Sequence, residues 1–153
     1  PEILPAVARQ NVAYVGMHMR GTPLTMQAHT QYDDIMREII LYFSELQEKA
    51  ALAGINDLII DPGFGFAKTK DDNFMLLTRL REFTVTGLTV LVGVSRKSMI
   101  YKHLNIRPED SMPGTITLNT IALTHGASII RVHDVKPAVE MVKLTSKTLN
   151  SKL

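Results

Sequence analysis

Four short apolar runs recur along the chain, and helix-length stretches separate them. The runs do not alternate with polar residues, which is typical of strands that are buried on both faces. Strands that alternate with helices form parallel sheets through right-handed crossover connections. The sequence therefore predicts four consecutive βα units with parallel strands. The predicted strands are residues 12–17, 58–61, 90–94 and 129–132.

The run that ends at Asp61 carries the clearest signal of a functional site. A Pro–Gly–Phe–Gly–Phe loop, residues 62–66, follows Asp61 at once and ends the strand. Asp61 is thereby placed at the carboxyl end of a strand, where α/β sheets and barrels bind their ligands. Phe64 and Phe66 could line a planar ligand or pack beneath the loop, and a strand-end Asp could instead cap a helix.

The stretches between the strands carry helical signals. In the second predicted helix the apolar residues recur at helical spacing and form one stripe: Ile35, Ile39, Phe43, Leu46 and Ala50. Asp134 is expected to cap the last helix with its side chain. The predicted helices are residues 1–9, 33–53, 71–87, 98–104, 115–125 and a last one that follows Asp134.

The number of units leaves two architectures open. A closed (β/α)8 barrel needs eight strands and about 250 residues, whereas the chain has 153 residues and four predicted strands. It is therefore either a small open α/β sheet or the second half of a barrel, and we expect residues 1–153 to form a single domain. The sequence begins without Met and inside a predicted helix, which favours a piece of a longer chain.

Composition narrows the classes of function. The net charge of +2 comes without a basic run, so the sequence does not argue for a nucleic acid partner. The chain has no Cys, which excludes disulfides and thiolate metal sites within it. The five His are scattered without the spacing of a metal-ligand set. With no secretory signal and no apolar stretch of about twenty residues, we expect a cytoplasmic protein that does not enter a membrane.

The last predicted strand ends in two cationic or proton-exchanging groups. The spacing of Arg131 and His133 puts both side chains on one face. Together they would clamp a phosphate, with Arg131 as a bidentate donor. Alternatively, Arg131 pairs with an acid and His133 is satisfied in the core. Asp61, a carboxylate that would face these cations, suggests recognition of a donor-rich ring or orientation of Lys97.

The first and third predicted strands end in polar residues as well. Residues 95–98, Ser–Arg–Lys–Ser, offer two cations and two hydroxyls that suit an anion or a polar heterocycle. A solvated basic turn is the alternative, and Arg96 could also belong to an ion-pair scaffold. Met17 fits either the core or the wall of a pocket. His18, between two Met residues, is more typical of a packed or hydrogen-bonded histidine than of a ligand.

Four motifs occur in a fixed order along the chain. They are Met17-His18-Met19-Arg20-Gly21-Thr22-Pro23, Asp61-Pro62-Gly63-Phe64-Gly65-Phe66 with Lys68, Gly93-Val94-Ser95-Arg96-Lys97-Ser98, and Arg131-Val132-His133-Asp134-Val135. In this order and at this spacing they resemble the motifs of dihydropteroate synthases. The resemblance covers the whole chain, from the helix before that family's fifth barrel strand to its last helix.

The resemblance implies an α/β fold, a TIM-type (β/α)8 barrel of which this chain supplies the second half. Such an enzyme is a transferase of folate biosynthesis. It condenses 6-hydroxymethyl-7,8-dihydropterin pyrophosphate with para-aminobenzoate and gives 7,8-dihydropteroate and pyrophosphate. The first four strands of that barrel are not in the sequence, so activity of this chain by itself is not expected.

The resemblance also implies roles for residues and partners. Contacts to the pterin are expected from Met17, Asp61, Phe66 and Lys97. Contacts to para-aminobenzoate, and to the sulfonamides that bind in its place, are expected from Phe66, Lys97 and Ser98. Arg131 and His133 are expected to bind pyrophosphate and, together with Lys97, to act in catalysis. Mg²⁺ would be held by a ligand in the missing half, so that no metal ligand is expected in this chain. The family also forms homodimers, and Ile116, Ile121 and Leu123 supply more apolar surface than one helix face needs.

Two other interpretations stay open. A pterin-binding methyltransferase barrel would share the fold, although a methyl donor without pyrophosphate needs no clamp of Arg131 and His133. The chain could also be a non-catalytic half-barrel fragment.

Overall fold

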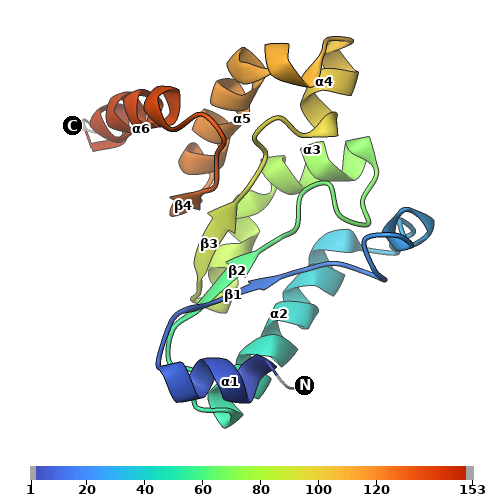
Figure 1. The fold of residues 1–153 in the computed structure, drawn as a ribbon, viewed down its shortest axis with the longest axis vertical. Coiled ribbons are helices and arrows are strands. Elements are labelled where there is room, and N and C mark those ends of the chain that lie inside the picture. Colours follow the sequence, from blue (N-terminus) through green and yellow to red (C-terminus); the bar gives the residue numbers. More distant parts are fainter. Residues whose placement is uncertain (1–2, 151–153) are drawn as a thin grey trace.

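The sheet has four parallel strands, which confirms the main structural prediction. The computed structural model of the protein describes residues 3–150 (Figure 1). The strands are β1 (Tyr14–Met17), β2 (Leu58–Asp61), β3 (Thr89–Val92) and β4 (Ile129–Ile130), in the spatial order β1-β2-β3-β4. Met17 pairs with Asp61 and Val92 pairs with Ile130, so the carboxyl ends of the strands meet at one edge of the sheet.

The helices alternate with the strands as expected. They are α1 (Ile3–Gln10), α2 (Ile35–Leu52), α3 (Lys70–Thr78), α4 (Ser98–Leu104), α5 (Met112–Thr124) and α6 (Val135–Asn150). Short 3-10 segments lie at η1 (Met26–Ala28), η2 (Leu80–Thr86) and η3 (Pro108–Asp110). The first two residues of the predicted helix 1–9 lie outside the described residues.

Two helix boundaries differ from the prediction. The helix expected at residues 71–87 is divided into α3 and η2 around Arg79, because its last turns tighten to 3-10 geometry. Helix α5 begins at Met112 and not at Thr115. Pro113 lies in its first turn, where the missing N–H of proline would have had no partner in any case.

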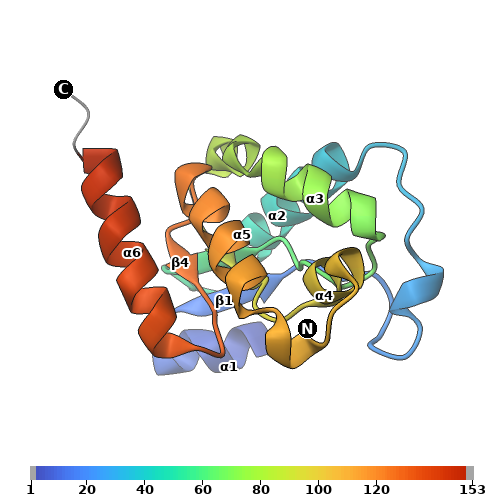
Figure 2. The ribbon, with the colours of Figure 1, turned by 90° about the horizontal axis from the view of Figure 1, so that it is seen from above.

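The hydrophobic core lies between the sheet and helices α2, α3 and α5 (Figure 2). The predicted stripe of α2 is buried at Ile35, Ile39, Phe43 and Ala50, and Leu46 packs against the core. Strand residues on the same side of the sheet, such as Ile60 and Val92, are fully buried. The helices therefore seal this face of the sheet.

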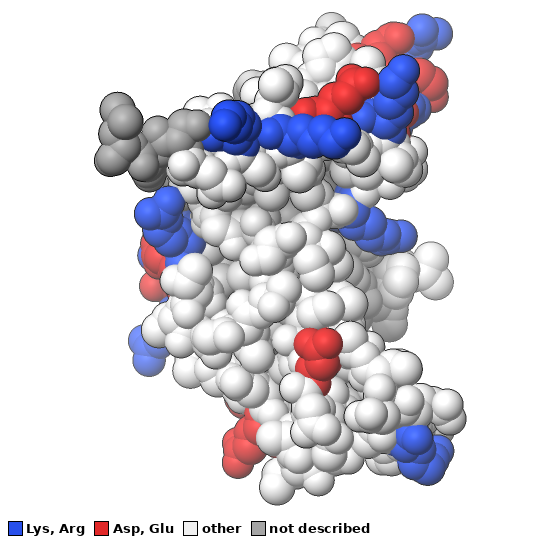
Figure 3. All heavy atoms as spheres, turned by 90° about the vertical axis from the view of Figure 1, so that its left-hand side faces the viewer, with Lys and Arg blue, Asp and Glu red and all other residues white. Residues whose placement is uncertain are grey.

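The other face of the sheet is less covered. Val15 of β1 points to that side and is 44% exposed, whereas its neighbour Gly16 on the helix side is buried. Figure 3 shows a middle region made mostly of uncharged side chains, with charged side chains at the upper end, along the edges and in the lower part. Four parallel βα units with one sealed face and one open apolar face have the form of a half-barrel.

Candidate functional site

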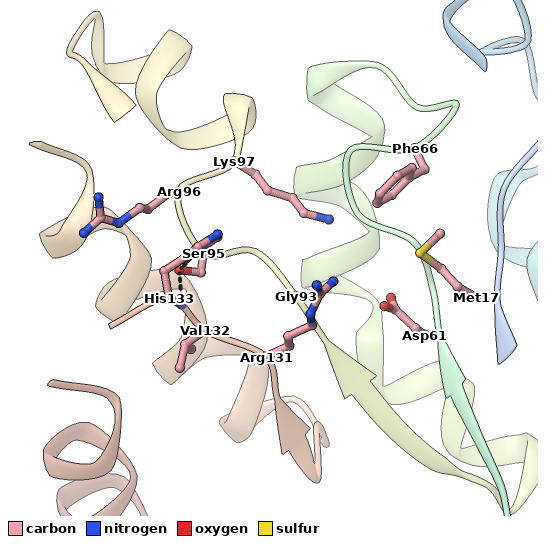
Figure 4. A pocket seen from close by; sticks show the side chains of 10 residues that line it. All are labelled: Met17, Asp61, Phe66, Gly93, Ser95, Arg96, Lys97, Arg131, Val132 and His133. Carbon is pink, nitrogen blue, oxygen red and sulfur yellow. Dashed lines mark hydrogen bonds between the residues drawn. The ribbon is translucent and has the colours of Figure 1, made fainter. Parts of the chain in front are cut away.

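The four strand-end motifs meet at one cavity, as predicted. A cavity of about 350 Å³ opens at the carboxyl ends of the strands (Figure 4). It is lined by Met17, Asp61, Phe66, Gly93, Ser95, Arg96, Lys97, Arg131, Val132 and His133. Of the residues that the resemblance assigns to ligand contacts, Ser98 is not in this group. It lines a neighbouring cavity of about 200 Å³ together with Lys68 and Lys102.

Asp61 supplies the carboxylate of the cavity. It is the last residue of β2 and is only 8% exposed. One of its oxygens accepts a hydrogen bond from the backbone N–H of Gly63 at 2.8 Å. Burial raises the pKa of the Asp61 carboxyl, although the Gly63 N–H and the charges of Lys97, Lys68 and Arg131 oppose this shift. Asp61 is therefore a buried acceptor that cationic groups surround.

Arg131 is the guanidinium that points toward Asp61 across the cavity (Figure 4). Its backbone N–H donates to the backbone carbonyl of Val92 and so extends the hydrogen bonds between β3 and β4. Within residues 3–150 its side chain makes no hydrogen bond or salt bridge, and only a longer-range attraction links it to Asp61. Five N–H donors are thus available to an anion in the cavity.

Arg96 belongs to an ion-pair scaffold, the second of the two alternatives left open for it. Its guanidinium donates to both carboxylate oxygens of Asp134, at 3.0 and 2.6 Å. Asp134 does precede α6, and its backbone carbonyl accepts from Ala138, as that of an N-cap residue does. Within residues 3–150 its carboxylate makes no hydrogen bond to the backbone of α6, so the expected side-chain cap was wrong, and the carboxylate ties the end of β4 to the end of β3.

The sequence left open whether the two phenylalanines of the loop after β2 pack in the core or line the cavity, and each does one of the two. Phe64 is fully buried and packs in the core, whereas Phe66 lines the cavity. The Lys97 ammonium lies 4.6 Å from the centre of the Phe66 ring and donates to the Phe64 carbonyl. Burial lowers the pKa of Lys97, against the attraction of Asp61. Lys97 and Phe66 thus form one wall with a cation beside an aromatic face.

Lys68 holds this loop in place, a role that sequence reasoning missed. It is 4% exposed, and its ammonium lies 3.1 Å from Nδ1 of His18. It also donates to the carbonyls of Gly63 and Phe66, at 3.1 and 3.0 Å. Three N–H donors thus meet three acceptors. The sequence signals were the position of this lysine shortly after the loop and its place in the second motif.

Gly63 lets the loop approach the end of β1. Its φ of +73° lies in the left-handed region, and a Cβ at this position would lie 2.0 Å from the backbone oxygen of His18. His18 is buried and hydrogen-bonded, as the sequence predicted, and its ring also contacts Tyr42 edge-on. The ends of β1 and β2 are therefore locked together beneath the cavity.

Burial lowers the pKa of both Lys68 and His18. Desolvation lowers the pKa of Lys68 to about 7, although Asp61 attracts the charge. Desolvation, followed by the charges of Lys68 and Arg20, lowers the pKa of His18 to about 3. His18 is therefore neutral at physiological pH, which leaves one ring nitrogen free to accept from Lys68.

The shifted pKa of Lys68 predicts a rise of stability with pH above neutrality. Between pH 7 and 10.5 the unfolded chain holds a proton on this lysine that the folded chain has released. The free energy of unfolding therefore increases with pH in this window. In the protein, Lys68→Met should remove that part of the increase. Urea unfolding from pH 7 to 10 measures it, with exposed Lys70→Met as control. Parallel profiles of wild type and Lys68→Met would contradict the prediction.

The described residues offer no metal cluster and no membrane span. Among residues 3–150 no group of three or more His, Asp or Glu side chains is arranged to hold a metal ion. No helix in this part of the chain is both long enough and apolar enough to cross a membrane.

Comparison with known proteins gives one consistent family. Residues 1–133 match the family model described as pterin binding enzyme. The dihydropteroate synthase of Escherichia coli K12 is 44% identical over 154 aligned residues, which cover 99% of this chain and 55% of that protein. The chain thus spans about half the length of the curated relatives that it matches.

Solved structures agree with this result. The Yersinia pestis dihydropteroate synthase, in a complex with a sulfonamide drug, is 42% identical and superposes with a TM-score of 0.96 over 99% of this chain and 56% of that one. The Thermus thermophilus enzyme, in a complex with 6HMPPP, is 34% identical, with a TM-score of 0.92 over 96% of this chain and 59% of that one. The open-sheet alternative is thereby set aside in favour of the second half of a (β/α)8 barrel, and the chain belongs to the pterin-binding enzyme family.

Proposed function

We propose that this chain, joined to the first half of its barrel, is a dihydropteroate synthase, and we call that whole protein the complete enzyme. It joins 6-hydroxymethyl-7,8-dihydropterin pyrophosphate to para-aminobenzoate and releases pyrophosphate. One observation carries the proposal: the guanidinium of Arg131, without an ion-pair partner among the described residues, faces the buried carboxylate of Asp61 across one cavity. This pairing offers an acceptor for a donor-rich ring at one end and donors for an anion at the other.

The pterin would lie between the ends of β1, β2 and β3. Asp61 would accept from the ring and amino N–H groups, and Met17 would pack along the ring. Lys97 and Phe66 would border the same space from the loop side. A buried carboxylate with a raised pKa gains from such donors, because they replace the water that it has lost.

The pyrophosphate would lie at the ends of β3 and β4. The reaction breaks the bond between the pterin methylene carbon and the bridging oxygen, whose electron pair leaves with pyrophosphate. The amine nitrogen of para-aminobenzoate then forms the new C–N bond and loses one proton. Arg131 and His133 would donate to the leaving group, whose charge grows in the transition state, and would thus lower the barrier.

The para-aminobenzoate would enter beside Phe66 and Lys97. Ser98 would reach it from the neighbouring cavity, whose rim also carries Lys102. The Thermus thermophilus enzyme has also been solved in complex with 4-aminobenzoate, which supports this assignment. Sulfonamides would compete for the same place.

Mg²⁺ would be held from outside this chain. Asp61 is the one carboxylate among the described residues that line the cavity, and it already accepts from a backbone N–H. Mg²⁺ prefers several oxygen ligands in octahedral geometry, so these residues do not form a site for it by themselves. A ligand in the first half of the barrel would supply what is missing.

A pyrophosphate-release assay tests the function. We expect the complete enzyme to release pyrophosphate only when both the pterin pyrophosphate and para-aminobenzoate are present. Methyl transfer from a methylated pterin without pyrophosphate release would favour the methyltransferase alternative. Absence of both activities would contradict both functions, and an intact mass of the natural protein near 17.1 kDa would favour a non-catalytic half-barrel. We further propose that residues 1–153 form one domain of this enzyme and that it works in the cytoplasm.

We expect the complete enzyme to be a homodimer through α5 and α6. A groove between these helices is lined mainly by apolar and Thr side chains, including Ile116, Met141 and Leu144, and Leu144 is largely exposed. Leu123 of α5 is also half-buried, whereas Ile121 packs against the hydrophobic core and is not part of this surface. Light scattering at micromolar concentration should give twice the mass of one chain, and Leu144→Glu should shift it toward the monomer. A wild-type monomer would refute the expectation.

A further inference from the structure

Ser95 makes two contacts to one histidine. It lies just beyond β3 and is 4% exposed. Its Oγ lies 3.2 Å from the backbone nitrogen of His133 and 3.0 Å from Nδ1 of the same residue (Figure 4). Ser95, at the end of β3, therefore contacts both the backbone and the ring of His133, which lies just beyond β4.

The donors and acceptors of this contact can be counted. The backbone N–H of His133 can only donate, so Oγ of Ser95 accepts there. Within the described part of the chain, Nδ1 of His133 is the one acceptor recorded near the hydroxyl proton of Ser95. If Nδ1 carried a proton instead, two donors would point at one oxygen and the buried hydroxyl proton would have no acceptor, an arrangement that proteins avoid.

The hydroxyl of Ser95 therefore donates to Nδ1. A neutral imidazole has one N–H and one bare nitrogen, so an acceptor at Nδ1 places the proton of His133 at Nε2.

We propose that Ser95 is a positioning residue that holds His133 in its Nε2–H tautomer. The side chain of His133, which lines the same cavity as Arg131, then presents a hydrogen-bond donor and no acceptor at its Nε2 end. The identity of the ligand rests on the proposed function. In that reaction the Nε2–H tautomer makes His133 a donor to the leaving pyrophosphate, and His133 is then not the base that takes the proton of the arylamine.

His125 provides an internal reference of the opposite kind. Its Nδ1 lies 2.8 Å from the backbone oxygen of Ile121. A carbonyl oxygen can only accept, so His125 must carry its proton on Nδ1. The two histidines should therefore show opposite tautomers in one spectrum.

Nitrogen-15 NMR of the histidine rings in the complete enzyme tests the proposal without any activity. At pH 8, above the ordinary histidine pKa near 6.5, long-range proton–nitrogen correlations distinguish Nδ1–H from Nε2–H. His133→Gln and His125→Gln assign the two signals. We expect Nε2–H at His133 and Nδ1–H at His125. An Nδ1–H signal at His133 would overturn the proposal.

Variants of Ser95 complete the test. Ser95→Ala should shift His133 toward the mixture of a free imidazole and leave His125 unchanged, and Ser95→Thr should restore the single tautomer. Binding of inorganic pyrophosphate should weaken by about two-fold or less in Ser95→Ala, because part of the His133 population would still present its Nε2–H. A His133 signal that Ser95→Ala leaves unchanged would overturn the role of Ser95. Opposite tautomers together with no pyrophosphate binding would support it and contradict the proposed function instead.

Discussion

Asp61→Asn should weaken binding of the pterin to the complete enzyme by about a thousand-fold. The carboxylate can accept from two N–H groups of the ring, whereas Asn would turn its NH₂ donor toward one of them. Two lost charge-assisted hydrogen bonds at about 2 kcal/mol each amount to about 4 kcal/mol, and 1.4 kcal/mol corresponds to a factor of ten. Calorimetry with the free pterin, which lacks pyrophosphate, measures the contacts of Asp61 to the ring without those of the protein to the pyrophosphate group.

The same substitution should not weaken the fold. Burial already disfavours the charged form of Asp61, so a neutral Asn of the same shape is expected to leave the urea midpoint equal or higher. Asp110→Asn is the matched control. Asp110 is an exposed carboxylate that pairs with Arg107 and lies outside the cavity, so pterin binding should stay unchanged there. Normal pterin affinity in Asp61→Asn would refute the assignment of this residue.

Arg131→Ala should give the complementary result. We expect the pyrophosphate ester of the pterin to bind about ten- to a hundred-fold more weakly and turnover to slow, while the free pterin binds nearly as before. The reason is that a charge-assisted contact to phosphate oxygens in a partly desolvated site contributes roughly 1.5–3 kcal/mol. Calorimetry with both ligands separates the two effects.

The control for Arg131→Ala is Arg107→Ala, which removes a guanidinium that is paired with Asp110 outside the cavity. It should change neither affinity. Equal losses for the free pterin and its ester in Arg131→Ala would mean that Arg131 holds the fold and not the leaving group.

The sheet and the members of the site could be predicted from the sequence because both depend on local patterns. An apolar run such as residues 58–61 has no polar side chain to expose before its final Asp, so it must be buried, and the carboxyl ends of parallel strands share one edge of the sheet. Asp61, Lys97, Arg131 and His133 therefore had to lie near one another, and they line one cavity.

The partners of the polar side chains could not be predicted in this way. Asp134 stands where a capping residue is expected, yet Arg96, which is 38 positions away, takes its carboxylate. From the sequence Lys68 is expected at the surface, because lysines are rarely buried. In the structure the loop covers it, and the carbonyls of Gly63 and Phe66 accept from its ammonium. Phe64 and Phe66 stand in an irregular loop without a strand or helix period, so their orientations depend on backbone angles that the pattern does not specify.

The strand order β1-β2-β3-β4 follows the order of the chain without exception. Within residues 3–150 every strand pairing is made between strands that are neighbours in the sequence, and none reaches back over an intervening strand. A segment that keeps residues 14–130 intact carries all of these pairings with it. Exchange of complete halves between members of the family would therefore create new strand pairings only along the outer edges of β1 and β4. Recombination at these two edges would keep Asp61, Arg131 and the contact of Lys68 with His18 together in one inherited segment.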